Sequence, residues 1–67
     1  MSKATMTSAL RARYEADIAE ADVTINIYLN HPVGLGEHPQ HLDEIDKLLD
    51  KIKEAEEKIS LIERWVK

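Results

Sequence analysis

Cysteine is absent from this chain of 67 residues, which also holds only two glycines, two prolines and three aromatic residues. The absence of cysteine excludes disulfides and most of the zinc sites known in proteins. A chain this short buries little apolar surface, and a single core of this size rarely supplies more than about 3–5 kcal/mol. Oligomerisation is the remaining common source of stability, so we expect the chain to assemble with itself.

Long apolar runs and an excess of positive charge are also missing. No run approaches the ~18–20 apolar residues of a membrane-spanning helix, and the first five residues lack the apolar core of a signal peptide. The net charge of −4 argues against duplex nucleic acid, which is bound largely through neutralised phosphates, and against anionic membranes. We therefore expect a cytoplasmic protein without membrane or duplex nucleic-acid partners.

The first predicted element is a helix over residues 8–30, with Thr7 or Ser8 as its N-cap. Its apolar residues fall on two nearly opposite lines. The line expected to pack within the chain consists of Tyr14, Ile18, Ala21, Ile25 and Tyr28. The second line consists of Ala12, Ala16, Ala19, Val23 and Ile27. Because a two-helix chain covers only one of them, we interpret the second line as a subunit interface; the alternative is that its alanines are simply exposed.

The second predicted element is a helix over residues 40–66, opened by Pro39 or Gln40. Its apolar residues keep heptad spacing, with Leu42 and Leu49 widening the stripe: Ile45, Leu48, Ile52, Ala55, Ile59, Ile62 and Val66. The segment 23–29 alternates as a strand would, but a lone strand would have no partner in this chain. The sequence therefore predicts a single all-α domain over residues 1–67, an antiparallel two-helix hairpin that oligomerises into a helical bundle.

The predicted loop, residues 31–39, is longer than a tight helix connection requires, and long loops often carry function. The candidate ligand-binding residues around it are Tyr28, His31, Gly34, Gly36, Glu37, His38 and His41. The histidines and the glutamate could bind a metal, but they lack the regular spacing typical of such sites. The loop could equally cap the second helix and plug the hairpin. We expect no metal, no cofactor and no catalytic residue, and hence no enzyme.

The opposite end of the hairpin holds a second candidate site. Antiparallel pairing places Arg11, Arg13 and Tyr14 opposite the stretch around Lys58, and Arg64 and Trp65 near the N-terminus. Arginines beside aromatic rings suit an anionic, planar ligand. The alternative is that these are ordinary charges at helix ends. Leu61 and Trp65 lie off the heptad stripe, which indicates either a tryptophan folded back over the hairpin or a second contact surface.

The segment from Asn30 to Pro39, within residues 14 to 63, resembles a group of small helical-hairpin proteins of tailed bacteriophages. The resemblance implies a viral origin and a place of action in the infected bacterium. By analogy, some small phage proteins are helical oligomers that sequester nucleotide immune signals without chemistry. The first functional hypothesis is such an anti-defence protein, which holds a small nucleotide-like ligand; the alternative is a protein–protein interaction module, an adaptor or inhibitor of a host or virion protein.

Overall fold

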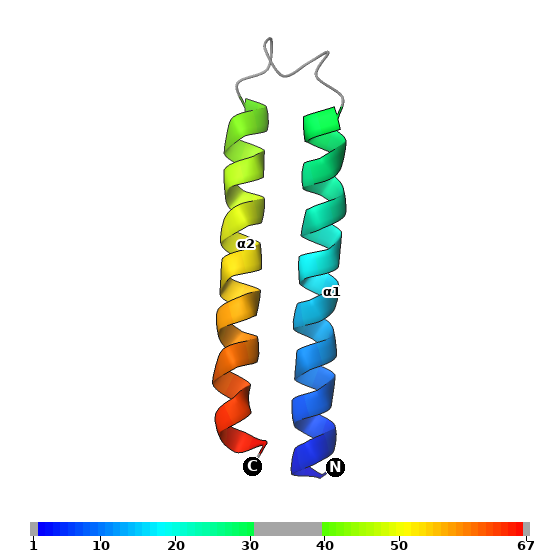
Figure 1. The fold of residues 1–67 in the computed structure, drawn as a ribbon, viewed down its shortest axis with the longest axis vertical. Helices are drawn as coiled ribbons and strands as arrows, with labels where there is room; N and C mark the ends of the chain where they lie inside the picture. The colour runs from blue at the N-terminus through cyan, green and yellow to red at the C-terminus, as the bar shows by residue number, and fades with distance from the viewer. Residues whose placement is uncertain (1, 31–39, 67) are drawn as a thin grey trace.

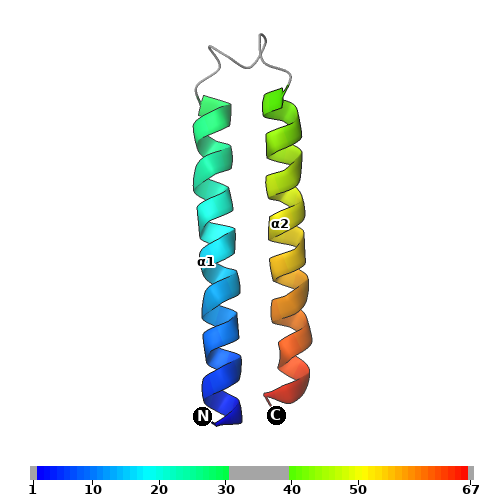
Figure 2. The same cartoon turned by 180° about the vertical axis from the view of Figure 1, so that it is seen from behind.

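The computed structural model describes residues 2–30 and 40–66 as a helical hairpin. Helix α1 spans Lys3–Asn30, helix α2 spans Gln40–Ile62, and the short 3₁₀ helix η2 spans Glu63–Trp65. Helices α1 and α2 run antiparallel, side by side along their length, and both ends of the chain lie at the same end of a rod of 50 × 14 × 14 Å (Figures 1 and 2). The predicted all-α hairpin is confirmed, and the described ranges contain no strand.

The N-terminus of α1 lies five residues earlier than predicted. The backbone amide of Thr5 donates a hydrogen bond of 3.1 Å to Oγ of Ser2, which therefore caps the helix. Thr7 already lies inside the helix, where its hydroxyl donates to the carbonyl of Lys3. The prediction of Thr7 or Ser8 as N-cap was wrong, because an earlier serine satisfies the free amides and nothing after it breaks the helix.

The strand-like segment 23–29 is helical, as expected. Its polar side chains bond to the helix itself, since Thr24, Asn26 and Asn30 each donate to the carbonyl four residues earlier, at 2.9–3.0 Å. Asn30 is the last residue of α1, and its side chain bonds back to the carbonyl of Asn26 within the last turn. The absence of a partner strand outweighs the β-branched composition of this segment.

The core of the hairpin is thin. Among the described residues only Ala21 and Ala55 are buried, at 0% and 4% exposure. The small side chains let the helix axes approach closely. The intrachain stripes predicted from spacing are otherwise half-buried, with Tyr14, Ile18, Ile25 and Tyr28 on α1 and Ile45, Leu48, Ile52, Ile59 and Ile62 on α2. These stripes are confirmed as the contact between the helices.

Three apolar residues assigned to the α2 stripe are exposed instead. Leu42 and Leu49 lie too far round the helix to reach α1. Val66 is exposed because α2 ends at Ile62, not at residue 66, and the chain tightens into η2, where the amide of Val66 bonds to the carbonyl of Glu63 at 3.4 Å. A 3₁₀ turn rotates about 120° per residue, which moves the following side chains off the heptad stripe.

Candidate binding surfaces

A hollow of about 370 Å³ lies at the end of the hairpin where both termini meet. We call it the terminal hollow. Its walls come from the first turns of α1 and from the C-terminal turn, and its lining residues are Lys3, Ala4, Thr7, Ser8, Arg11, Trp65 and Val66. The volume falls at the lower end of the range of small-molecule sites. Two of the predicted ligand-binding residues, Arg11 and Trp65, are brought together there.

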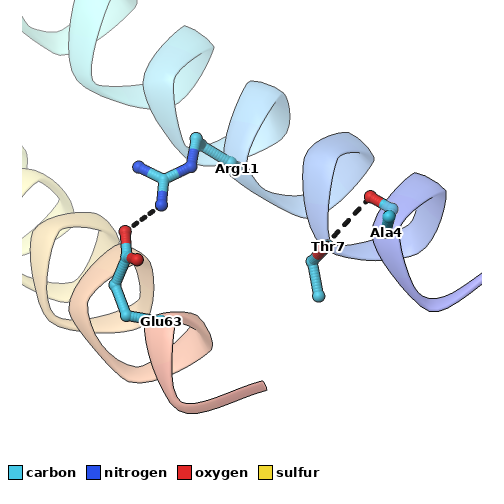
Figure 3. A network of polar contacts seen from close by, with 4 residues as sticks. All are labelled: Ala4, Thr7, Arg11 and Glu63. Atoms are coloured by element: carbon cyan, nitrogen blue, oxygen red, sulfur yellow. Dashed lines mark hydrogen bonds and ion pairs between the residues drawn. The ribbon is translucent and has the colours of Figure 1, made fainter. Parts of the chain in front are cut away.

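The charge in the terminal hollow is partly neutralised. The guanidinium of Arg11 on α1 pairs with the carboxylate of Glu63 on η2 (Figure 3). Both side chains are more than one third exposed, so solvent screening limits the pair to about 0–1 kcal/mol. Within the described ranges, no carboxylate lies within ion-pair distance of Lys3. An anion entering the hollow would therefore meet the ammonium of Lys3 and the guanidinium of Arg11, which Glu63 shares.

The aromatic surface of the hollow is the indole of Trp65, which is 53% exposed. Tyr14 lies near it in the sequence but does not line the hollow. The ammonium of Lys58 lies 5.5 Å from the ring centre of Tyr14, as expected from antiparallel pairing around Lys58. This cation–π contact joins α2 to α1 and contributes about 0.5–1 kcal/mol at an exposed site.

The predicted arginine cluster is divided in space. Arg13 follows Arg11 by two residues, about 200° around the helix, so the two side chains leave α1 in different directions. Arg64 is exposed and, like Arg13, is not part of the hollow.

Sequence reasoning missed three residues that line the hollow, Lys3, Ala4 and Thr7, because the helix was expected to begin only at residue 8. Ser2, which caps the helix, was the available signal for the earlier start.

At the other end of the hairpin, the rings of Tyr28 and His41 lie with their centres 5.1 Å apart and their planes tilted by 33°. These two candidates thus contact each other across the helix pair. The remaining candidates of this end lie outside the described residues: His31, Gly34, Gly36, Glu37 and His38. Among the residues that are described, no group of histidine and acidic side chains is placed to hold a metal ion.

The predicted interface line on α1 is exposed along its whole length. Its members are Ala12, Ala16, Ala19, Val23 and Ile27. The same spacing of three and four continues the line to uncharged residues on either side, Thr5, Ala9, Asn26 and Asn30. A face without charge that faces solvent over the full length of a helix is a candidate contact surface.

Neither helix in the described part of the chain is long and apolar enough to cross a membrane. In comparisons with known proteins, no family model matches the chain, and neither a curated protein nor a solved structure matches it.

Proposed function

We propose that this chain is a non-enzymatic association module, a helical hairpin that works by assembling with itself and contacting other proteins. One observation carries the proposal: nine large apolar side chains within residues 2–30 and 40–66 are exposed. Those with 44–66% exposure are Met6, Val23, Ile27, Leu29, Leu42, Leu49, Leu61, Trp65 and Val66. A core built around two buried alanines leaves this surface for a partner to cover.

The exposed area supports the same proposal. The chain exposes 5192 Å², whereas a compact monomer of this mass exposes about 4300 Å². The surplus of about 900 Å² is close to the ~800 Å² that each partner contributes to a standard protein interface. One interface per hairpin would thus bring the exposed area back to that of a compact protein.

The first prediction concerns the mass in solution. At micromolar concentration the protein should sediment with at least twice the 7.7 kDa of one chain, and its melting temperature should rise with protein concentration, because association stabilises the folded state. Sedimentation velocity and thermal unfolding at several concentrations measure both. A 7.7 kDa species with a concentration-independent melting temperature would contradict the proposal.

A second candidate function is favoured by the terminal hollow. Lys3, Arg11 and Trp65 offer two cations beside an aromatic plane, which suits an anionic, planar ligand such as a nucleotide. In this proposal the assembled hairpins sequester a nucleotide-like immune signal in the cytoplasm of a phage-infected bacterium. The sequence resemblance over residues 14 to 63 supports the phage origin, and the analogy with small helical phage proteins that sequester nucleotide signals supports the anti-defence role.

The second prediction uses Trp65, which is the single tryptophan of the chain. Adenosine monophosphate should change its fluorescence saturably, while adenosine or inorganic phosphate alone should do so far more weakly.

Variants of the ion pair test the same site. Glu63→Gln should tighten the binding of adenosine monophosphate several-fold, because it frees Arg11, and Arg11→Gln should weaken that binding by a similar factor. Arg13→Gln, outside the hollow, is the matched control. Fluorescence that stays constant with adenosine monophosphate, or an equal effect of both arginine variants, would rule out this site for that ligand.

A further inference from the structure

The last two turns of α1 are helical, but their sequence alternates as a β-strand does. Residues 23–30 read Val-Thr-Ile-Asn-Ile-Tyr-Leu-Asn, and we call them the alternating segment. In an extended chain, successive side chains point to opposite faces, so the four aliphatic residues would form one face and the polar and tyrosine side chains the other. The segment has no charge, glycine or proline, a composition typical of chains that stack into cross-β assemblies.

A helix does not bring these aliphatic side chains together. Residues two apart lie about 200° apart around a helix, so the four side chains leave α1 on different faces. Val23, Ile27 and Leu29 remain 60%, 54% and 58% exposed, and Ile25 is half-buried. A strand would align all four on one face, where an identical face can cover them. Conversion to a strand would therefore remove from water apolar surface that the hairpin leaves exposed.

The hairpin holds this end of α1 weakly. Among the described residues of α1 only Ala21 is buried, and it precedes the alternating segment. The ion pair between Glu20 and Lys51, at 3.7 Å, precedes it too. Within the segment, half-buried side chains make the contact with α2, such as the ring of Tyr28 beside that of His41. A helix end with few buried apolar contacts opens locally at low free energy.

We propose that the alternating segment is a conformational switch, helical in the hairpin and a β-strand in an assembly of many copies of this chain. An isolated strand is unstable, and the described part of the hairpin contains no strand that could pair with it. The same segment of other copies supplies that partner once this end of α1 opens. This assembly is separate from the helical association proposed above and does not depend on it.

The polar face of the segment suits stacking as well as the aliphatic face does. In a sheet of aligned copies, each residue lies on the same residue of the next copy. Asn26 and Asn30 then form ladders of side-chain amides, and Tyr28 stacks on itself, which adds to the stability of cross-β assemblies. In the hairpin the same two amides bond back to carbonyls of their own helix. The strand thus gives these side chains new partners in place of the old ones.

Charge opposes the switch and makes it conditional. Asp22, directly before the segment, is exposed, and aligned copies would bring identical carboxylates close together. The net charge of −4 also keeps separate chains apart at low ionic strength. Charged residues that flank a β-prone run limit its aggregation in natural proteins. The assembly should therefore form more readily when salt screens these charges.

The third prediction concerns this assembly. Full-length protein agitated in salt just below its melting temperature should bind thioflavin T and give fibre reflections at about 4.7 Å and about 10 Å. Ile27→Lys should lengthen the lag time about tenfold or more, because it puts a charge into the aliphatic face of the strand. The hairpin should tolerate this change, since Ile27 is 54% exposed and lysine is a good helix former.

Met6→Lys is the matched control. Met6 is 48% exposed on the same helix and lies within residues 4–10, which are also uncharged but contain neither valine nor isoleucine. The substitution adds the same charge outside the alternating segment and should leave the lag time within about twofold of the parent. Circular dichroism checks that both variants start as helices. If Ile27→Lys is not helical, Val23→Lys repeats the test at a residue with 60% exposure.

Protease digestion of the assemblies, followed by mass spectrometry, locates the protected core. A core that contains residues 23–30 supports the switch. Aggregates that stay helical by infrared spectroscopy, a protected core on α2, or equal lag times for the two lysine variants would overturn it. A parent chain that forms no assembly in salt near its melting temperature would overturn it as well.

Discussion

Replacing Ala21 with leucine is expected to lower the free energy of unfolding by about 1–3 kcal/mol. Ala21 is the only residue of α1 that is fully shielded from solvent, and it faces α2 where the helices approach closely. A leucine there has no space, so the helix axes must separate and the half-buried isoleucines lose contact. For a domain of this size the melting temperature should fall by roughly 4–8 °C per kcal/mol, measured at a fixed protein concentration.

Ala19→Leu is the matched control for this experiment. Ala19 lies two residues away on the same helix but is exposed, so the identical substitution should change the free energy of unfolding by about 0.5 kcal/mol or less. Equal losses in both variants would contradict the central role of Ala21. A change of oligomeric state in Ala19→Leu alone would identify the uncharged line of α1 as a contact surface.

Truncating Tyr14 to alanine should cost about 2 kcal/mol. Truncating a fully buried aromatic side chain to alanine lowers the free energy of unfolding by about 3–5 kcal/mol. Tyr14 is only half-buried, so its truncation should cost less. Its ring also faces the ammonium of Lys58 at 5.5 Å, a contact worth about 0.5–1 kcal/mol at an exposed site. Chemical denaturation of Tyr14→Ala at constant concentration measures the total.

Two further variants divide this loss between packing and charge. Tyr14→Phe keeps the ring and should stay within about 0.5 kcal/mol of the parent. Lys58→Met keeps an apolar stem and removes the cation, so it should lose only the cation–π contribution of up to about 1 kcal/mol. If Tyr14→Phe lowered the free energy of unfolding as much as Tyr14→Ala does, the hydroxyl and not the ring would be the group that stabilises the hairpin.

Periodicity predicted the hairpin and its contact stripes because helical spacing decides which side chains share a face. Tyr14, Ile18 and Ala21 repeat at three and four, and they face α2 as expected. The helix ends were harder to predict. The choice between Ser2 and Thr7 as N-cap depends on small differences in local hydrogen bonding, and the change to 3₁₀ geometry after Ile62 leaves no periodic signal.

The binding residues could be predicted only in part, for a related reason. Antiparallel pairing correctly placed Trp65 near the N-terminus and Lys58 opposite Tyr14. It could not indicate that Arg11 pairs with Glu63, since spacing within one helix does not fix which side chain reaches across to the other. Antiparallel pairing also could not place Lys3 in the hollow, because the first helix was expected to begin only at residue 8.

The terminal hollow is lined by the first turns of α1 and by Trp65 and Val66. Both of its walls therefore belong to the ends of the chain, where helices fray more readily than in their middle. A fluctuation that unwinds either end removes one wall of the hollow while the middle of the hairpin stays folded.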